Sequence, residues 1–189
     1  MDLISFGEDG WLLSTADPIA VAAAIDRRGL DEVVPGERHV LLRGPRSRVL
    51  AALEVLPADP QRPPPREPVL LPARWDGPDL HEVAVVAGMS EAAVVDLVAA
   101  TMLTVAFCGF APGFAYLTGL DERLHVPRRE RPRPQVPPGS IAIAAGYCAV
   151  YPTASPGGWH LIGHCDALLF HADRRPPSLL APGDRVRFV

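Results

Sequence analysis

The first part of the chain alternates short apolar runs with turn residues, a pattern typical of a small α+β unit. Residues 3–6 and 11–14 are largely apolar and flank the turn-rich tetrapeptide 7–10, which predicts a β-hairpin. Asp17 followed by Pro18 has the residue types of a helix N-cap and a first helical position. A helix is therefore expected directly after the hairpin.

The pattern continues with the end of this helix, two further strands and a second helix. Gly29 is the expected stop of the first helix, and residues 32–34 and 39–43 have strand character. Pro45 predicts the start of a second helix, whose apolar face at helical spacing contains Val49, Leu50, Leu53 and Leu56. Because no cluster of acid, base and nucleophile occurs here, we interpret residues 1–57 as an N-terminal α+β domain for packing or docking.

Residues 58–68 are dominated by proline. Proline favours extended polyproline II backbone and separates packed units. We interpret this segment as a linker and place the domain boundary there. A PxxP recognition motif is the alternative for the same composition.

After the linker the pattern changes to a helical pair and a series of short strands. Residues 69–71 predict a strand, Pro78 and Asp79 open a helix that ends before Gly88, and Ser90 caps a second helix. Further strands are expected at 101–108, 141–143, 148–151, 159–162, 167–170 and 185–189. Many short strands divided by Gly/Pro turns predict a closed or nearly closed β-barrel over residues 69–189, so the fold class is mixed α+β and mainly β.

Composition excludes several function classes. The chain has 189 residues, 48% of them hydrophobic, and a net charge of −4, which argues against nucleic-acid binding. It contains no lysine, so a Walker A lysine and a Schiff base are both excluded, and no GxGxxG fingerprint occurs. No apolar run is long enough for a membrane span, so no membrane association is expected. Three cysteines without framework spacing, Cys108, Cys148 and Cys165, are typical of reduced thiols in a cytoplasmic protein.

Several motifs of the second domain together resemble the PxpB/KipI family, also known as allophanate hydrolase subunit 1. They are GFAPGFAYLTGL at 109–120, the Pro-Arg pairs 127–128 and 132–133, VPPGSIAIA at 136–144, YPTASPGGWHLIGH at 151–164 and PGDRVRFV at 182–189. The resemblance implies a cyclophilin-like β-barrel after the N-terminal α+β domain. The chain departs from the family pattern at Val98, Leu103 and Cys165, where relatives tend to carry histidine, an aromatic residue and threonine.

The same resemblance implies a function. It indicates a component of a bacterial 5-oxoprolinase, which uses ATP to open 5-oxo-L-proline to L-glutamate in a complex of PxpA-like, PxpB-like and PxpC/KipA-like subunits. ATP is thus the expected cofactor, with its site on this chain or shared with a partner. The KipI relative instead inhibits a sporulation histidine kinase.

Four arginines lie among prolines at 127–134, and proline backbone holds them in fixed directions. Guanidinium forks suit carboxylates and phosphates. Arg128 and Arg133 occupy the Pro-Arg positions of the resemblance and are candidates for a substrate carboxylate, ATP phosphates or a partner's acidic patch. Arg129 and Arg131 are expected to be solvated.

Two histidines close the motif region. His160 and His164 are four residues apart, which on a regular strand would place both on one face. With Cys165 as the only neighbouring ligand type, the pattern is weak for zinc, and no metal site is predicted. His164 is a candidate acid/base or ligand-binding group, with a buried, hydrogen-bonded histidine as the alternative.

The remaining candidates predict a groove for substrate, nucleotide or a partner loop. Its expected walls are aromatic, although aromatics in barrels often belong to the core: Phe110, Phe114, Tyr116, Tyr151 and Trp159. The associated turn residues are Gly109, Pro112, Gly113, Pro156, Gly157 and Gly158, the last two offering backbone amides for an anion nest. Ser140 belongs to the set, but without a GxSxG elbow a turn-capping role is favoured.

We therefore expect a hydrolase subunit that acts on a cyclic amide with ATP. It should have little activity alone, because no complete catalytic constellation is visible in the sequence. The alternatives are a KipI-type protein that binds a histidine kinase and a non-catalytic, cyclophilin-like binding module.

Overall fold

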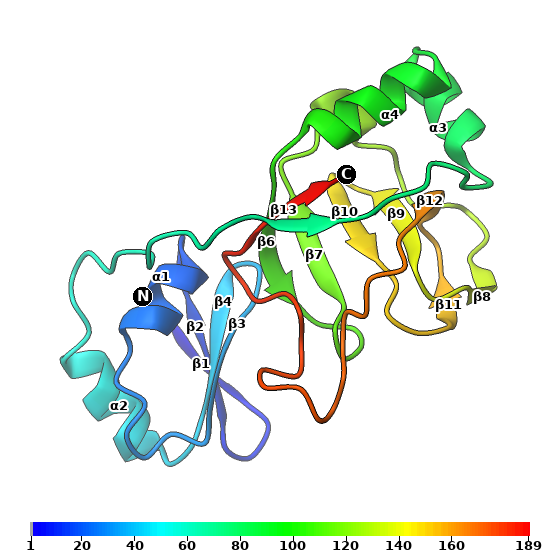
Figure 1. Cartoon of the computed structure of the whole chain (residues 1–189). Coiled ribbons are helices and arrows are strands. Elements are labelled where there is room, and N and C mark those ends of the chain that lie inside the picture. Colours follow the sequence, from blue (N-terminus) through cyan, green and yellow to red (C-terminus); the bar gives the residue numbers. More distant parts are fainter. Residues whose placement is uncertain (1) are drawn as a thin grey trace. The chain divides into compact units, whose positions relative to one another are not determined.

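The computed structural model describes residues 2–189 and shows a mixed α+β fold (Figure 1). The chain divides into two compact units, one that ends at Pro65 and one from Arg66–Val189. Between Glu54 and Val69 the described chain forms neither helix nor strand.

The first unit is a four-stranded antiparallel sheet with two helices. Its strands run in the order β1-β2-β4-β3, with bounds Leu3–Phe6, Gly10–Ser14, His39–Arg43 and Glu32–Pro35 in that order. The helices are α1, Pro18–Ala24, and α2, Arg46–Glu54. The hairpin, both further strands and the Asp17 cap are confirmed, since the Asp17 carboxylate accepts from the Ala20 amide at 3.0 Å.

Two details of the first unit differ from the sequence prediction. Helix α1 ends at Ala24 and not near Gly29, because the Asp26 carboxylate accepts from the Arg28 amide at 3.0 Å and offers the backbone a local turn in place of another helical one. In α2 the buried face contains Ala52 where Leu50 was expected, and Leu50 is exposed.

The second unit is built on a seven-stranded sheet with the order β12-β9-β10-β7-β6-β13-β5. In that order the strands are His160–His164, Ser140–Ala144, Tyr147–Val150, Ala115–Thr118, Leu103–Cys108, Arg185–Phe188 and Val69–Leu71. All neighbours are antiparallel except β13 and β5. A separate two-stranded ribbon pairs β8, Arg133–Val136, with β11, Ser155–Gly157.

The sheet curls until its two edges meet at one residue pair. Arg74, just beyond β5, and His164, at the end of β12, exchange two backbone hydrogen bonds of 2.8 and 2.7 Å. The result is a curled half-barrel, which agrees with the expected barrel at this level of detail (Figure 1). The finer likeness to cyclophilin stays a prediction.

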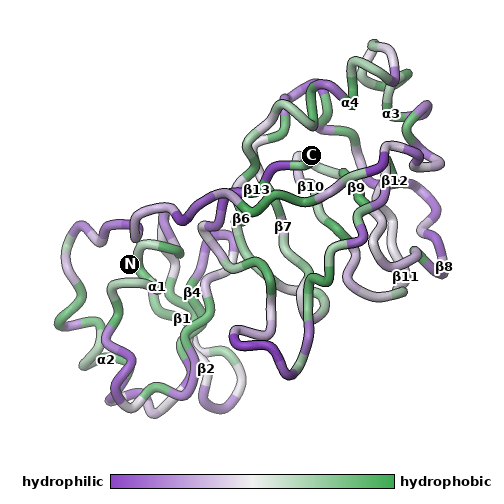
Figure 2. The backbone as a smooth tube through the Cα atoms, in the orientation of Figure 1, coloured by the Kyte–Doolittle hydropathy of each residue, from purple (hydrophilic) through white to green (hydrophobic). Residues whose placement is uncertain are grey.

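Alternate residues along the strands of this sheet point to opposite faces and join two different clusters. Ile141, Ile143 and Cys148 join the core beneath the helical hairpin of α3, Leu80–Ala87, and α4, Glu91–Ala100. The alternate residues Ala142, Ala144 and Ala149 belong to a second cluster that is rich in aromatic side chains. Coloured by residue hydropathy, β6, β7 and β9 are mainly hydrophobic, whereas the chain near β8 is hydrophilic (Figure 2).

The helical hairpin follows the prediction closely. Gly88 ends α3 with φ 67°, and the Ser90 hydroxyl accepts from the Ala93 amide at 3.1 Å at the start of α4. In the described chain no single helix is both long and apolar enough to cross a bilayer. The two helices reach that length and composition only as a pair bent by 91°.

The strand expected at 167–170 is wrong. Only an isolated bridge between Phe170 and Ser178 occurs there. The Arg174 guanidinium donates to the carbonyls of Leu168 and Leu169. These carbonyls are therefore satisfied by a side chain and not by the backbone N–H groups of a neighbouring strand. Three strands were not predicted: β7, and the β8 and β11 ribbon that contains Pro134 and Pro156. Proline demotes a strand assignment because it cannot donate to a ladder.

A buried ion-pair network fixes the arginine-rich segment to the start of α3. The Asp79 carboxylate is 3% exposed and accepts from Arg133 at 2.7 Å, from Arg129 at 2.9 Å and from the Leu161 amide of β12 at 2.7 Å. Burial alone would raise the pKa of Asp79, but these hydrogen bonds and the two positive charges outweigh it and lower the pKa.

The closure of the half-barrel depends on the absence of a side chain at Gly163. A Cβ there would collide with the Arg74 carbonyl and lie 3.1 Å from the Trp75 ring. We expect Gly163→Ala to lower the free energy of unfolding by about 1–3 kcal/mol in chemical denaturation, because the backbone pair must separate. Gly109→Ala is the control, since its Cβ would meet only Tyr116 at 4.0 Å. Equal effects of the two substitutions would contradict this account.

The Asp79 network makes a second prediction. Asp79→Asn leaves two arginines without their shared anion and should lower the free energy of unfolding by about 3 kcal/mol. Because the folded pKa is lowered, the wild-type contribution is complete above the ordinary aspartate pKa of about 3.9 and disappears as the pH falls through and below it. Denaturation curves across acidic pH should therefore converge for wild type and variant. Asp166→Asn, which breaks an exposed pair with Arg74, should cost much less.

Candidate functional site

A cavity of about 240 Å³ lies against the aromatic cluster of the second unit, and we call it the aromatic cavity. Its lining comes from β7, the ends of β10 and β11, and the start of β12. It contains nine of the sequence candidates: Phe110, Phe114, Tyr116, Arg128, Tyr151, Pro156, Gly157, Gly158 and Trp159. Pro132 completes the lining and was not among the predicted site residues. The structure thus brings most of the expected groove together.

Phe114 organises the walls of this cavity. Its ring centroid lies 5.0 Å from that of Tyr116, 5.2 Å from Tyr151 and 5.8 Å from Trp159, each in edge-to-face geometry. Phe114 is 2% exposed, so the expectation of a core role for the aromatics holds for this ring, while its partners present the cavity surface.

Tyr151 supplies a polar group to the cavity. A Cβ on Gly157 would collide with its hydroxyl, so only glycine permits the β11 backbone to lie against this ring. Burial raises the pKa of Tyr151, and Tyr116 adds to the rise while Arg128 opposes it, so the hydroxyl is a neutral hydrogen-bond donor at neutral pH. Within residues 2–189 it has no hydrogen-bond partner, and neither has the Trp159 indole N–H.

Phe110 stands at the cavity with an unusual backbone. Its φ is 68°, the left-handed region that favours glycine, yet the phenyl ring is 62% exposed and edge-on to Phe114 and Tyr151. A residue kept in this conformation while its ring faces solvent is typical of functional loops. Gly109, Pro112 and Gly113 belong to this loop but do not line the cavity.

The four arginines divide into two pairs that differ from the predicted ones. Arg133, expected at the site, turns its guanidinium to Asp79 and does not line the cavity. Arg129 was expected to be solvated, which is wrong: it binds Asp79 and Glu82, each at 2.9 Å. In the described part of the chain, Arg128 and Arg131 have no hydrogen bond or ion pair, and Arg128 lines the aromatic cavity.

His164 and Ser140 lie outside the cavity. The His164 ring contacts Asp166 at 2.8 Å, and Asp166 accepts from Arg74 at 2.6 Å. Ser140 is the cross-strand neighbour of His164, but its hydroxyl donates to the Pro137 carbonyl at 2.8 Å, which is the turn-capping role. No hydrogen bond joins Ser140 to His164 in the described residues, so Ser140, His164 and Asp166 do not form a catalytic triad.

His160 and His164 have different surroundings because β12 carries a bulge. Pairing with β9 shifts register between Leu161 and Gly163, so the even spacing no longer places both rings on one face. His160 is 5% exposed, with Nε2 3.0 Å from the Pro127 carbonyl. Within residues 2–189, no three His, Cys, Asp or Glu side chains are grouped as a metal ion would require.

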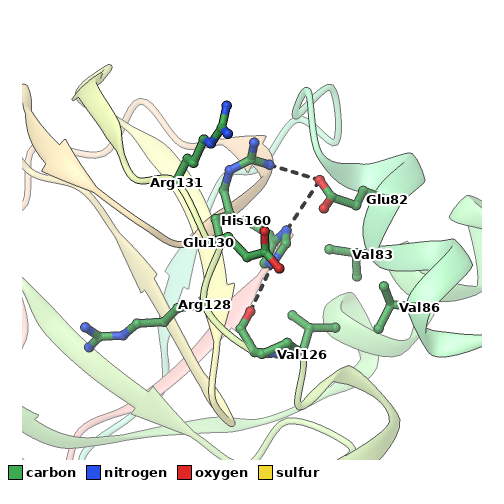
Figure 3. Close-up of a pocket in the computed structure, with 10 residues that line it drawn as sticks. Glu82, Val83, Val86, Val126, Arg128, Glu130, Arg131 and His160 are labelled. Carbon is green, nitrogen blue, oxygen red and sulfur yellow. Dashed lines mark hydrogen bonds and ion pairs between the residues drawn. The ribbon is translucent and has the colours of Figure 1, made fainter.

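A second cavity, of about 390 Å³, lies between α3 and the arginine-rich segment, and we call it the charged cavity (Figure 3). Glu82, Arg129, Glu130, Arg131 and His160 supply its polar lining, and Arg128 lines it as well as the aromatic cavity. Sequence reasoning missed Asp79, Glu82 and Glu130 as parts of this region. Glu82 and the buried Asp79 belong to a helix start, which gives no signal of its own for a site.

The departures from the family pattern do not touch either cavity. Val98, Leu103 and Cys165 are all buried in the core beneath the helices. They line neither the aromatic nor the charged cavity. Differences at these positions therefore change core packing and leave the cavity walls unaltered.

Comparison with known proteins agrees with the fold. The family model described as carboxyltransferase domain, subdomain C and D, matches residues 3–180. The B subunit of the 5-oxoprolinase of Escherichia coli O157:H7 is 40% identical over 202 aligned residues, which cover 97% of this chain and 93% of the relative. The B subunit of the 5-oxoprolinase of Bacillus subtilis strain 168 is 45% identical over 113 residues, 60% of this chain and 47% of the relative.

Solved structures show the same architecture. TTHA0988 superposes with a TM-score of 0.85 at 34% identity, covering 95% of this chain but only 40% of that one. A conserved uncharacterized protein, PH0987, from Pyrococcus horikoshii has a TM-score of 0.63 at 32% identity over 100% of this chain and 96% of that one. The urea amidolyase of K. lactis, at 18% identity and a TM-score of 0.72 over 99% of this chain and 14% of that one, shares the fold. By its family match and its likeness to the Escherichia coli protein, the chain belongs to the carboxyltransferase domain, subdomain C and D, family and within it to the PxpB group of 5-oxoprolinase components.

Proposed function

We propose that the chain is the B-type subunit of a cytoplasmic, ATP-dependent 5-oxoprolinase that opens 5-oxo-L-proline to L-glutamate together with PxpA-like and PxpC/KipA-like subunits. The names of its relatives support this assignment. The observation that carries the role of this chain is the aromatic cavity with the unpaired guanidinium of Arg128 on its wall.

The cavity suits a small cyclic amide that carries a carboxylate. Its 240 Å³ lie just below the range of about 300–1,000 Å³ that holds drug-sized ligands, so a single five-membered ring is a suitable occupant. The Arg128 fork binds the carboxylate in bidentate geometry. The Tyr151 hydroxyl and the Trp159 N–H are the donors available to the lactam carbonyl.

We infer that this chain does not bind the nucleotide alone. The aromatic cavity offers one unpaired guanidinium to a triphosphate, and in the charged cavity the carboxylates of Glu82 and Glu130 stand among Arg128, Arg129 and Arg131 and oppose phosphate there. We therefore assign the ATP site to a partner subunit. In this scheme the chain binds and orients the lactam and excludes water from its ring, while the partner supplies the groups that activate it.

The first test is a coupled assay of ATP hydrolysis and glutamate release with this chain, with partner subunits encoded nearby, and with the mixture. We expect activity only in the mixture. Arg128→Ala should lower kcat/KM by about 10- to 100-fold without loss of assembly, because one charged, bidentate contact is removed. Arg187→Ala, at an exposed arginine of β13, is the control and should have no effect.

Absence of activity in every combination, despite a stable complex, would exclude the 5-oxoprolinase role. Inhibition of a histidine kinase by the purified chain would then identify a KipI-type regulator. Full activity of Arg128→Ala would instead remove the aromatic cavity from the proposal.

Phe110 provides a second prediction, in which stability and binding move in opposite directions. Phe110→Gly relieves the left-handed backbone and should leave the free energy of unfolding unchanged or raise it by about 1 kcal/mol. The same change removes an aromatic wall, so affinity for 5-oxo-L-proline measured by calorimetry should fall. Ala145→Gly, at φ 51°, offers the same backbone relief away from the cavity and should leave affinity intact. Unchanged affinity in Phe110→Gly would show that the ring is not part of the site.

A further inference from the structure

The charged cavity contains a buried ring nitrogen without a hydrogen-bond partner, Nδ1 of His160. His160 Nε2 lies 3.0 Å from the Pro127 carbonyl, which can only accept, so Nε2 carries the ring proton. In the neutral ring Nδ1 is then an acceptor. It is buried, it has no hydrogen bond, and the nearest charged atom, Oε2 of Glu82, lies 3.7 Å away. That separation is too long for a direct hydrogen bond.

The groups around this nitrogen are also acceptors. Glu82 already accepts from Arg129, whose charge is divided between Glu82 and Asp79. Glu130 lines the cavity and has no hydrogen bond or ion pair within residues 2–189. Glu130 and His160 line the same cavity, and in Figure 3 Glu130 is drawn in front of the His160 ring, whereas the guanidinium groups of Arg128 and Arg131 point away from that ring.

The imidazole nitrogen of His160 and the glutamate carboxylates all accept hydrogen bonds, so a ligand between them should be a donor. An anion at this position would meet the Glu82 and Glu130 carboxylates and the Nδ1 lone pair, whereas Arg128, Arg129 and Arg131 line the rest of the cavity. A primary ammonium group offers three donors and one positive charge, which satisfies the histidine nitrogen and the glutamates together. The apolar side chains of Val83 and Val86 line the same cavity and suit aliphatic carbon, and Arg128, also in the lining, is available to a carboxylate.

We propose that the charged cavity binds a small amino acid. Its ammonium group lies between His160 Nδ1, Glu82 and Glu130, and its carboxylate pairs with Arg128 once that guanidinium turns toward the cavity. The site needs no contribution from the aromatic cavity other than this shared arginine. Only the choice of L-glutamate as a probe rests on the proposed function, because glutamate is the amino acid that opening of 5-oxoproline releases.

The test is binding of L-glutamate to the full chain by calorimetry, with glutarate as the matched ligand that lacks the amine. We expect L-glutamate to bind at least about tenfold more tightly than glutarate. Glu130→Gln, at an exposed residue without structural bonds, should remove about tenfold or more of that affinity. Glu122→Gln, on the short helix Glu122–Leu124, is the control and should change nothing.

Nitrogen NMR of the His160 ring gives a readout that a structural role would not move. On addition of L-glutamate the Nδ1 resonance should shift as expected for a neutral ring that accepts a hydrogen bond. Equal binding of glutarate, full affinity in Glu130→Gln, or a doubly protonated His160 ring before ligand is added would each overturn the proposal.

The same experiments separate this inference from the proposed function. Tyr151→Phe should weaken 5-oxo-L-proline binding and leave L-glutamate binding unchanged. A wild-type chain that binds L-glutamate but not 5-oxo-L-proline would remove the aromatic cavity from the proposed function and leave the amino-acid site standing. A wild-type chain that binds 5-oxo-L-proline but not L-glutamate would do the reverse.

Discussion

The Asp79 carboxylate connects three parts of the second unit that are distant in sequence. It stands at the start of α3, accepts from the β12 backbone at Leu161, and pairs with both Arg129 and Arg133. An anion this deeply buried is tolerated only because its charge is paired and its oxygens are hydrogen-bonded. The segment between Val126 and Val136 takes its course from these bonds, and both cavities are built along it. Pairing two arginines with Asp79 also decides which guanidinium remains for a ligand.

The aromatic cluster that the cavity lies against packs on a face of the curled sheet that contains alanine. Ala142, Ala144 and Ala149 leave room that larger side chains on the opposite face do not. Pleating assigns these residues and the bulkier core residues to different faces of the same strands. The β8 and β11 ribbon then approaches closely, which Gly157 permits by presenting no side chain to Tyr151. The shape of this region therefore depends on its alanine and glycine residues as much as on its aromatic residues.

Sequence patterns predicted correctly the turns and helix caps that depend on residues only a few positions apart. The hairpin at the start, the caps at Asp17 and Ser90 and the αL glycine at Gly88 each depend on neighbours within a few residues, and each is found. The set of groove residues could be assembled from glycine, proline and aromatic positions together with family motifs. Arg128 and Arg133 could not be distinguished, because the difference is Asp79, separated from Arg133 by 54 positions. The shared face expected for His160 and His164 was wrong for a similar reason, since a single bulge in β12 cannot be inferred from their even spacing.

Arg128 belongs to both cavities, and this has a thermodynamic consequence. A guanidinium that holds a carboxylate from one side has fewer donors left for the other. Occupants of the two cavities that both carry carboxylates would therefore compete for one cation, although they touch different walls. By linkage, each would lower the equilibrium affinity of the other by the same factor. A molecule retained in one cavity would thus regulate entry to its neighbour without any movement of the backbone.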